Sequence, residues 1–340
     1  MRPTNTAKDD PPMNDLLVSG LASPTGRQFG ICSDRDGHVV RAVMTEIGGT
    51  IRSLTVDGEP LIEEFPESGL PEHCEGQVLI PWPNRVRDGR WSHDGQVLQL
   101  DINEPQRGNA LHGLVKDQPH TVVRQSDTWL TLRVQVLPCE GYPFAVNVET
   151  TYSVTSEGLT VRHVVTNASA RPAPVAIGSH PYVRVGAALT EDLALTVNAA
   201  SYLVVDERLN PTGSAPVAGT PFDLSVGATV GSLDLDTAFL DLTPAPDGTY
   251  RHTLEAPNGD TVDVWGDHNY GYAQVYTTNE YPGAGGSRTA IALEPMTALP
   301  DAFNSGAGLR WLDPGESWCS SWGISHNFSN RRGTKDRGGK

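Results

Sequence analysis

Long apolar runs are missing from this sequence. No stretch approaches the roughly 20 consecutive apolar residues that a membrane-spanning helix needs, although 38% of the 340 residues are hydrophobic. The first fifteen residues hold charges and prolines where a signal peptide needs an apolar run. We therefore expect a cytoplasmic protein without a membrane partner. The sequence leaves open whether Met1 or Met13 is the first residue.

Cysteine is also scarce. The four cysteines are far apart and form no Cys-x-x-Cys pair, which argues against a thiolate metal site. We expect all four to be reduced and buried. The motifs GxSxG, HExxH, the Walker loop and GxGxxG are absent as well. These absences agree with an activity that needs no metal and no cofactor.

Positive charge is in deficit, because 25 lysines and arginines face 41 aspartates and glutamates and the net charge is −16. Such a surface repels nucleic acids and anionic membranes, so neither is expected as a partner. A strongly anionic substrate would require a local basic pocket. A neutral small molecule is compatible with this charge.

No helical stripe extends over three turns, whereas patterns of β-strands are frequent. Apolar and polar residues alternate in 129–136 and again in 144–154, where Phe144, Val148 and Tyr152 share one face. Turn pairs such as Asp57-Gly58, Asp94-Gly95, Glu157-Gly158 and Asn258-Gly259 separate β-rich segments. The patterns predict an all-β protein, an antiparallel sandwich or barrel.

The chain shows no composition break in its middle and no internal repeat. Residues 16–327 are therefore predicted to form one domain. Residues 1–15 and 328–340 are polar, and the second segment is basic and rich in glycine, so both are predicted to be disordered tails.

Five segments match neither a strand nor an ordinary turn, and loops of this kind often carry functional groups on a rigid scaffold. They are residues 81–85, 109–113, 179–182, 294–297 and 300–306. Each polar residue in them has an ordinary structural alternative. His112 or His180 alone could be a hydrogen-bonded structural histidine, Glu294 a solvated residue at a strand end, and Arg85 part of a surface ion pair. Asp236, outside these segments, could cap a turn.

Taken together and in this order, these motifs resemble the aldose 1-epimerase (galactose mutarotase) family over nearly the whole chain between the two tails. The resemblance is carried by Pro83-Asn84-Arg85 with Asp88-Gly89-Arg90, by His112-Gly113, by His180-Pro181-Tyr182, by Asp236, by Glu294 with Pro300-Asp301-Ala302, and by the closing segment 312–316.

The resemblance implies a large antiparallel β-sandwich, the galactose mutarotase-like supersandwich, with a cleft on one concave sheet. It implies that Glu294 is the general base and His180 the general acid, with His112 assisting by hydrogen bonding near the ring oxygen of a free sugar.

The resemblance also implies a set of sugar-binding residues. Arg85 and Asp236 would hold sugar hydroxyls, and Asn84 would order the arginine loop. Tyr182, like Trp82 and Phe303, has two interpretations: it stacks on the apolar face of the sugar or it packs in the core.

Three positions depart from the family pattern. Leu114 replaces the second glycine of His-Gly-Gly, Val183 replaces a common aromatic residue, and Met296 stands where well-known galactose mutarotases often have glutamine. Methionine cannot donate the hydrogen bonds of an amide. These changes leave the acid and the base in place and leave the preferred sugar open.

The implied reaction is the opening and reclosing of a hemiacetal ring at C1. It needs a base for the anomeric hydroxyl and an acid for the ring oxygen, which we expect on opposite sides of C1. We expect the Glu294 carboxylate to help keep His180 protonated. The substrate would be a free aldohexose such as glucose or galactose, and the protein a monomer or homodimer.

Three alternatives stay open. A glycoside hydrolase would pair Glu294 with Asp236 or Asp301. A non-catalytic sugar-binding module could use the same fold. An epimerase for sugar phosphates would need several basic groups at the site, and only Arg85 with Arg87 or Arg184 offers them.

Overall fold

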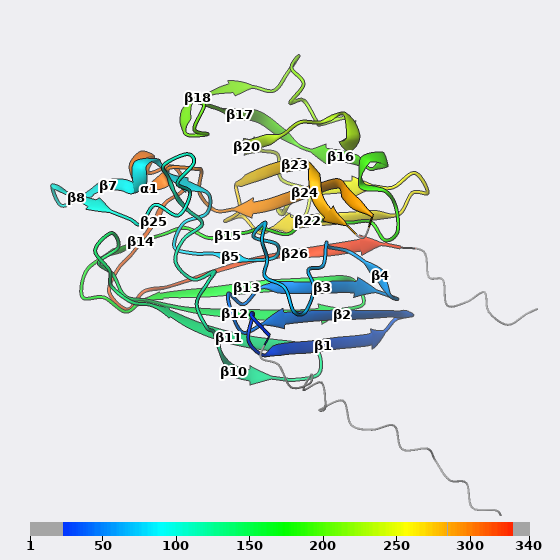
Figure 1. The fold of residues 1–340 in the computed structure, drawn as a ribbon, viewed down its shortest axis with the longest axis horizontal. Helices are drawn as coiled ribbons and strands as arrows, with labels where there is room; N and C mark the ends of the chain where they lie inside the picture. The colour runs from blue at the N-terminus through cyan, green and yellow to red at the C-terminus, as the bar shows by residue number, and fades with distance from the viewer. Residues whose placement is uncertain (1–22, 284, 329–340) are drawn as a thin grey trace, which may run out of the picture.

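The computed structural model describes residues 23–283 and 285–328, and it folds into antiparallel sheets (Figure 1). The predicted tail of residues 1–15 and the segment 329–340 lie outside the described residues. Phe328, at the start of the predicted C-terminal tail, is instead buried against the core.

The largest sheet has nine strands, and all neighbouring strands in it are antiparallel. Their order is β10 (Thr121–Gln125), β11 (Trp129–Val136), β12 (Val146–Thr155), β13 (Gly158–Asn167), β26 (Ser317–Asn327), β22 (Thr261–Gly266), β21 (Tyr250–Glu255), β16 (Ala194–Val197) and β19 (Ala228–Thr229).

A second antiparallel sheet has seven strands. Their order is β18 (Pro211–Pro216), β17 (Ala199–Val205), β20 (Asp236–Leu242), β23 (Tyr272–Gly283), β24 (Gly286–Met296), β15 (Gly178–Ser179) and β5 (Val78–Leu79).

The remaining strands form small sheets, and helices are short. A four-stranded sheet contains β1 (Gln28–Arg35), β2 (His38–Thr45), β3 (Ile51–Val56) and β4 (Glu59–Pro60). Three strand pairs are β6 (Arg85–Val86) with β9 (Ala110–Leu111), β7 (Arg90–His93) with β8 (Gln96–Gln99), and β14 (Ala173–Val175) with β25 (Arg310–Leu312). The helical segments are η1 (Arg87–Gly89), η2 (Thr190–Asp192), η3 (Val230–Ser232) and α1 (Ala302–Ser305).

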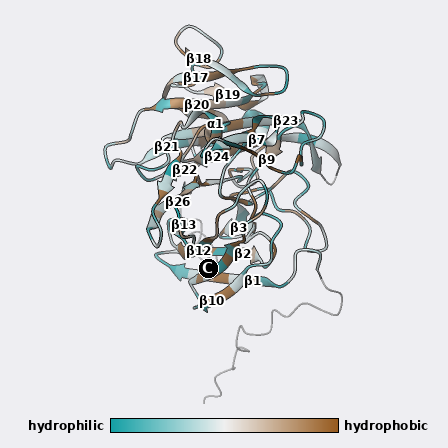
Figure 2. Ribbon diagram, turned by 90° about the vertical axis from the view of Figure 1, so that its left-hand side faces the viewer, coloured by the Kyte–Doolittle hydropathy of each residue, from teal (hydrophilic) through white to brown (hydrophobic). Residues whose placement is uncertain are grey.

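The sheets pack face to face. Strands β1 and β2 contact β12, and β24 contacts β22, so the four-stranded and seven-stranded sheets both cover the nine-stranded one. Their inner faces share one hydrophobic core. The end that carries β17 and β18 lies far from the end that carries β10 in two perpendicular views (Figures 1 and 2). The predicted all-β sandwich is confirmed.

The predicted alternation in β12 is confirmed, because every second residue from Val146 to Val154 is buried and the residues that alternate with them are partly or fully exposed. Two predicted tight turns are confirmed by left-handed backbone at both residues: φ is 54° and 88° at Asp57-Gly58, and 49° and 75° at Asp94-Gly95. At the other two predicted turns only the glycine has a positive φ.

The cysteines are all unpaired, but their predicted burial is wrong in part. Cys139 and Cys319 are exposed, and Cys32 and Cys74 are partly buried. Cys319 alternates with buried Trp318 on β26 and therefore faces solvent. Within residues 23–283 and 285–328, no helix has both the length and the apolar character needed to cross a membrane.

Candidate active site

Glu294 lies on the outer face of the seven-stranded sheet because of the two-residue period of β24. Ile291 and Leu293 point into the main core. Ala292 and Met296 belong to separate clusters on the opposite face, and Glu294 shares their side of the strand. The carboxylate is nevertheless only 2% exposed. The strand thus holds a buried carboxylate outside the main core.

The register of the sheet places His180 beside Glu294. Gly178 pairs with Met296, and Tyr182 forms a bridge with Ala292, so the residue midway between them lies opposite Glu294. The Pro181 carbonyl accepts a hydrogen bond from the Leu293 amide (3.1 Å), which holds this segment along β24.

A second part of the site is built by the short β6–β9 pair. Arg85 pairs with Leu111, and the His112 amide donates to the Asn84 carbonyl (2.9 Å). Asn84 and His112 both adopt left-handed backbone, with φ of 55° and 64°. The pairing therefore brings together the arginine loop and the first predicted histidine.

Gly113 explains the glycine that follows His112. Its φ is 71°, and a Cβ atom there would lie 2.3 Å from the Ile80 carbonyl oxygen. Only glycine tolerates both the conformation and the close approach. The turn after His112 therefore depends on this residue.

Glu294 and His180 are in direct contact. The His180 Nε2 atom lies 3.3 Å from Glu294 Oε1. The Glu294 Oε2 and His180 Nδ1 atoms are buried and have no hydrogen-bond partner among the described residues. The two groups lie side by side. The expected placement of an acid and a base on opposite sides of a sugar carbon stays a prediction.

Burial sets the protonation of this pair. It raises the pKa of Glu294 well above its ordinary value, and the nearby Asp236 carboxylate adds to the effect while Arg85 opposes it. Burial lowers the pKa of His180 to about 4. The expectation that the carboxylate keeps His180 protonated is thus reversed, because removal from water penalises both charges.

His112 is held as a neutral hydrogen-bond donor. Burial lowers its pKa well below the ordinary value, with smaller contributions from His180 and Arg85. Its Nδ1 atom accepts the Asn84 amide hydrogen (3.2 Å), so the proton of the neutral ring is on Nε2. The ring centroid lies 5.4 Å from that of His180, with the planes nearly perpendicular.

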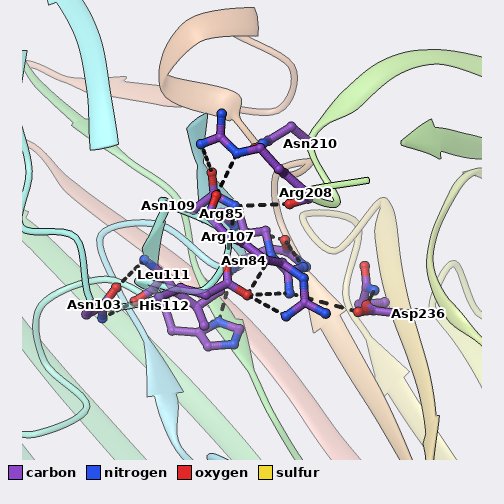
Figure 3. A network of polar contacts seen from close by, with 12 residues as sticks. Asn84, Arg85, Asn103, Arg107, Asn109, Leu111, His112, Arg208, Asn210 and Asp236 are labelled. Atoms are coloured by element: carbon purple, nitrogen blue, oxygen red, sulfur yellow. Dashed lines mark hydrogen bonds and ion pairs between the residues drawn. The ribbon is translucent and has the colours of Figure 1, made fainter. Parts of the chain in front are cut away.

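Arg85 and Asp236 are the other charged residues predicted for the site, and Figure 3 shows them with Asn84 and His112. The Arg85 side chain binds Glu104 with one edge, and its Nη2 atom lies 3.9 Å from Asp236 Oδ2. The other oxygen of Asp236 accepts a hydrogen bond from Gln274 Nε2 (2.6 Å). Burial raises the pKa of Asp236, and Arg85 opposes this. The side chain of Asp236 is 28% exposed, the most open of these groups.

Asn84 lies where it orders the arginine loop. Its Oδ1 atom accepts hydrogen bonds from the Arg85 amide (2.9 Å) and from Arg85 Nη1 (3.4 Å). The family-derived expectation for Asn84 therefore has a specific geometric basis.

The aromatic residues lie behind the polar groups. Tyr182 is 2% exposed and stacks on the His180 ring at 5.3 Å, so it supports the imidazole from one side. Trp82 and Phe303 are buried and contact each other edge to face at 5.3 Å. For these two, the core-packing alternative is favoured.

Two residues of the site were not predicted. Gln274 pairs across the strands with Glu294, and Glu104 holds Arg85. A glutamine in the middle of the buried stretch Ala273–Val275 was the available signal for the first. Glu104 lies in a loop without periodicity, and nothing in its local sequence indicates its partner.

Other charged residues named as candidates are engaged elsewhere. Asp301 Oδ1 accepts hydrogen bonds from the Arg87 amide (2.9 Å) and from Asn304 (2.7 Å), which fixes the loop before α1. Arg87 binds Asp206 (3.1 Å), and Arg184 lies 3.7 Å from Glu63. No group of three or more potential metal ligands occurs in the described part of the chain.

Comparisons with known proteins find similarity to aldose 1-epimerases. A family model described as aldose 1-epimerase matches residues 31–325. The Escherichia coli K12 protein YihR, described as uncharacterised, is 29% identical over 276 residues, which are 81% of this chain and 86% of YihR. Human galactose mutarotase is 34% identical over 157 residues, 44% of each chain.

Solved structures share the fold. The structure of a galactose 1-epimerase from Lactobacillus acidophilus has a TM-score of 0.71 at 21% identity and covers 88% of this chain and 98% of its own. An aldose epimerase homologue from C. elegans has a TM-score of 0.75 at 19% identity, with 88% and 99% covered. At these identities the likeness supports the architecture alone.

Proposed function

The chain belongs to the aldose 1-epimerase family and is an isomerase, and from this premise we propose that it interconverts the α and β anomers of a free aldohexose such as glucose or galactose. The observation that carries the proposal is the contact of 3.3 Å between Glu294 and His180 beside Arg85 and Asp236. We further propose that it acts in the cytoplasm, without metal or cofactor, as a monomer or homodimer.

The proposed chemistry uses the contact between the acid and the base. The anomeric oxygen and the ring oxygen are bonded to the same carbon, so they lie closer together than Nε2 and Oε1 do. Adjacent groups can therefore reach both oxygens from one side. Glu294 takes the proton of the anomeric hydroxyl while His180 donates a proton to the ring oxygen. The C1–C2 bond then rotates, and the exchange runs in reverse on the other face.

One shared proton is sufficient for this cycle. The pair can exist as imidazolium with carboxylate or as neutral imidazole with carboxylic acid, and both forms hold the same number of protons. Burial favours the uncharged form in the free protein. A bound sugar supplies hydrogen bonds at the two oxygens, which help to support the charged form. His112 would donate its Nε2 proton near the ring oxygen as a neutral assistant.

Sugar binding would rest on Arg85 and Asp236. The guanidinium offers donors in a rigid fork, and Asp236 offers acceptor oxygens, a combination suited to neighbouring hydroxyls. Gln274 adds an amide next to Glu294. Tyr182 stays a proposed sugar contact only at its edge, because its ring is stacked on His180.

Polarimetry of freshly dissolved α-glucose and α-galactose tests the proposal. The protein should accelerate the approach to the equilibrium rotation well above the spontaneous rate measured in the same buffer. No acceleration with any member of a panel of free aldoses would refute the assignment.

The hydrolase alternative is separated by an aryl glycoside assay. Asp301 is engaged in fixing a loop, so Asp236 is the remaining second carboxylate. Release of the aryl group would favour hydrolysis, and its absence together with accelerated mutarotation would exclude this alternative. A pure binding module would bind sugar without accelerating the change in rotation.

A further inference from the structure

Arg85 is held by Glu104 along one edge of its guanidinium. Nε lies 3.0 and 3.2 Å from the two Glu104 oxygens, and Nη2 lies 3.0 Å from Oε1. Both residues are buried. This arrangement uses Nε and one hydrogen of Nη2, so the opposite edge of the guanidinium is directed away from Glu104.

Glu104 itself cannot follow Arg85 toward the site. Its carboxylate also accepts hydrogen bonds from Arg107 Nη1 (3.1 Å) and Asn109 Nδ2 (3.0 Å). Its carbonyl accepts the amide hydrogens of Arg107 (3.2 Å), Gly108 (2.8 Å) and Asn109 (3.3 Å), which close a tight turn. Although burial alone would raise the pKa of Glu104, the contacts with Arg85 outweigh it and the pKa is lowered. The carboxylate is therefore a fixed negative anchor.

Asp236 competes for the same guanidinium. Its Oδ2 atom lies 3.9 Å from Arg85 Nη2, which is too far for a hydrogen bond (Figure 3). A movement of less than about one ångström would bring the two atoms within hydrogen-bonding distance. Asp236 is tied on its other side by Gln274 (2.6 Å). If Arg85 and Asp236 formed a direct ion pair, each would occupy hydrogen-bonding groups of the other, and fewer of these groups would remain for a sugar.

We propose that Glu104 is a positioning residue that holds Arg85 back from Asp236 and so keeps both groups available for sugar hydroxyls. The inference rests on the proposed function for its substrate, whereas the placement of Arg85 by Glu104 stands on geometry alone. Glu104 does not touch the reacting atoms and acts only through Arg85.

The test is the variant Glu104→Gln. Glutamine keeps the shape but presents one amide donor to the guanidinium, so the two-point contact is lost. A crystal structure of the variant should show Arg85 Nη2 within hydrogen-bonding distance of Asp236 Oδ2. The KM for the sugar should rise about tenfold, because the sugar must now separate a charge-assisted pair. The kcat should change less than about threefold, since Glu294 and His180 are untouched.

Two further variants distinguish positioning from general destabilisation. Glu63→Gln removes another buried carboxylate that binds an arginine (Arg288 Nη1, 2.8 Å), and it should lower the melting temperature without raising the KM. In a protein that already carries Asp236→Asn, adding Glu104→Gln should cost much less than it does alone, because no charged competitor remains.

The proposal is wrong if the Arg85–Asp236 distance in Glu104→Gln is unchanged, or if the effects of Glu104→Gln and Asp236→Asn on KM are additive. If Glu104→Gln fails to fold, Glu104→Asp replaces it in the test. Aspartate keeps the charge, but its shorter side chain holds Arg85 less closely. The distance from Arg85 Nη2 to Asp236 Oδ2 should then lie between 3.9 Å and that of a hydrogen bond. A wild-type protein without mutarotase activity would refute the proposed function, while the crystallographic distance would still decide the role of Glu104.

Discussion

Replacing Glu294 by glutamine separates the chemistry of the site from its packing. Glutamine has nearly the same shape, so the contact of 3.3 Å with His180 can persist, but the amide cannot accept a proton. A positioned general base typically contributes about 10²- to 10⁴-fold to a rate. We therefore expect Glu294→Gln to lower kcat by at least about 100-fold.

The same substitution should not destabilise the protein at neutral pH. Burial raises the pKa of Glu294 above its ordinary value near 4.3. Below about pH 4.3 the carboxyl is protonated in both the folded and the unfolded state, so it does not reduce the free energy of unfolding there. As the pH rises, the unfolded state ionises first and stability falls until the folded pKa is reached. Each unit between the two pKa values costs about 1.4 kcal/mol. Glutamine has no such cost.

Polarimetry of α-glucose and α-galactose measures the rate, and thermal unfolding at pH 4 and pH 8 measures the stability. The melting temperature of Glu294→Gln relative to wild type should be higher at pH 8 than at pH 4. Met296→Leu, on the same face of β24 and within an apolar cluster, should keep both properties. A Glu294→Gln rate within tenfold of wild type would refute the assignment of the base.

The pH profile of kcat/KM, which reports the sugar-free enzyme, should be a bell, because one proton must remain on the pair: the acid limb is expected near pH 4, where the pair gains a second proton, and the alkaline limb at the raised pKa of Glu294. A rate that does not fall below about pH 4, or that shows no alkaline limb after subtraction of the spontaneous reaction, would contradict this. His180→Asn should lower kcat about 10²- to 10⁴-fold, whereas His112→Asn should cost about tenfold or less; equal losses in the same polarimetric assay would make His112 a full catalytic partner. Gly113→Ala should reduce the free energy of unfolding by about 2 kcal/mol or more, because its backbone is left-handed and a Cβ would meet the Ile80 carbonyl; an unchanged denaturation midpoint would show that the turn can relax.

The sequence alone was sufficient for the fold class. Alternation of side chains is a local property, and the buried positions of β12 follow it residue by residue. The turn at Asp57-Gly58 was equally readable, because its left-handed backbone favours those residue types.

The site required long-range information that local patterns do not contain. Glu294, His180 and His112 come from three distant segments, and it was the family resemblance that grouped them. Their contacts depend on the register of β24 and on the β6–β9 pair. The protonation of His180 was predicted in the wrong direction because burial, a tertiary property, outweighs the neighbouring carboxylate. Glu104 escaped prediction for a similar reason.

Strand β24 serves both the fold and the site, because one face packs in the main core and the other carries Glu294. An inserted or deleted residue within this strand would exchange its sides, turning Glu294 inward and bringing an apolar neighbour such as Leu293 to the outer surface. The irregular pairing between Thr278 and Tyr281, nearer the tip of the hairpin, can absorb a change of length that the strand itself cannot. Variation in length among natural or engineered versions of this hairpin should therefore concentrate toward its tip, while the count of residues from Ala290 to Met296 stays constant.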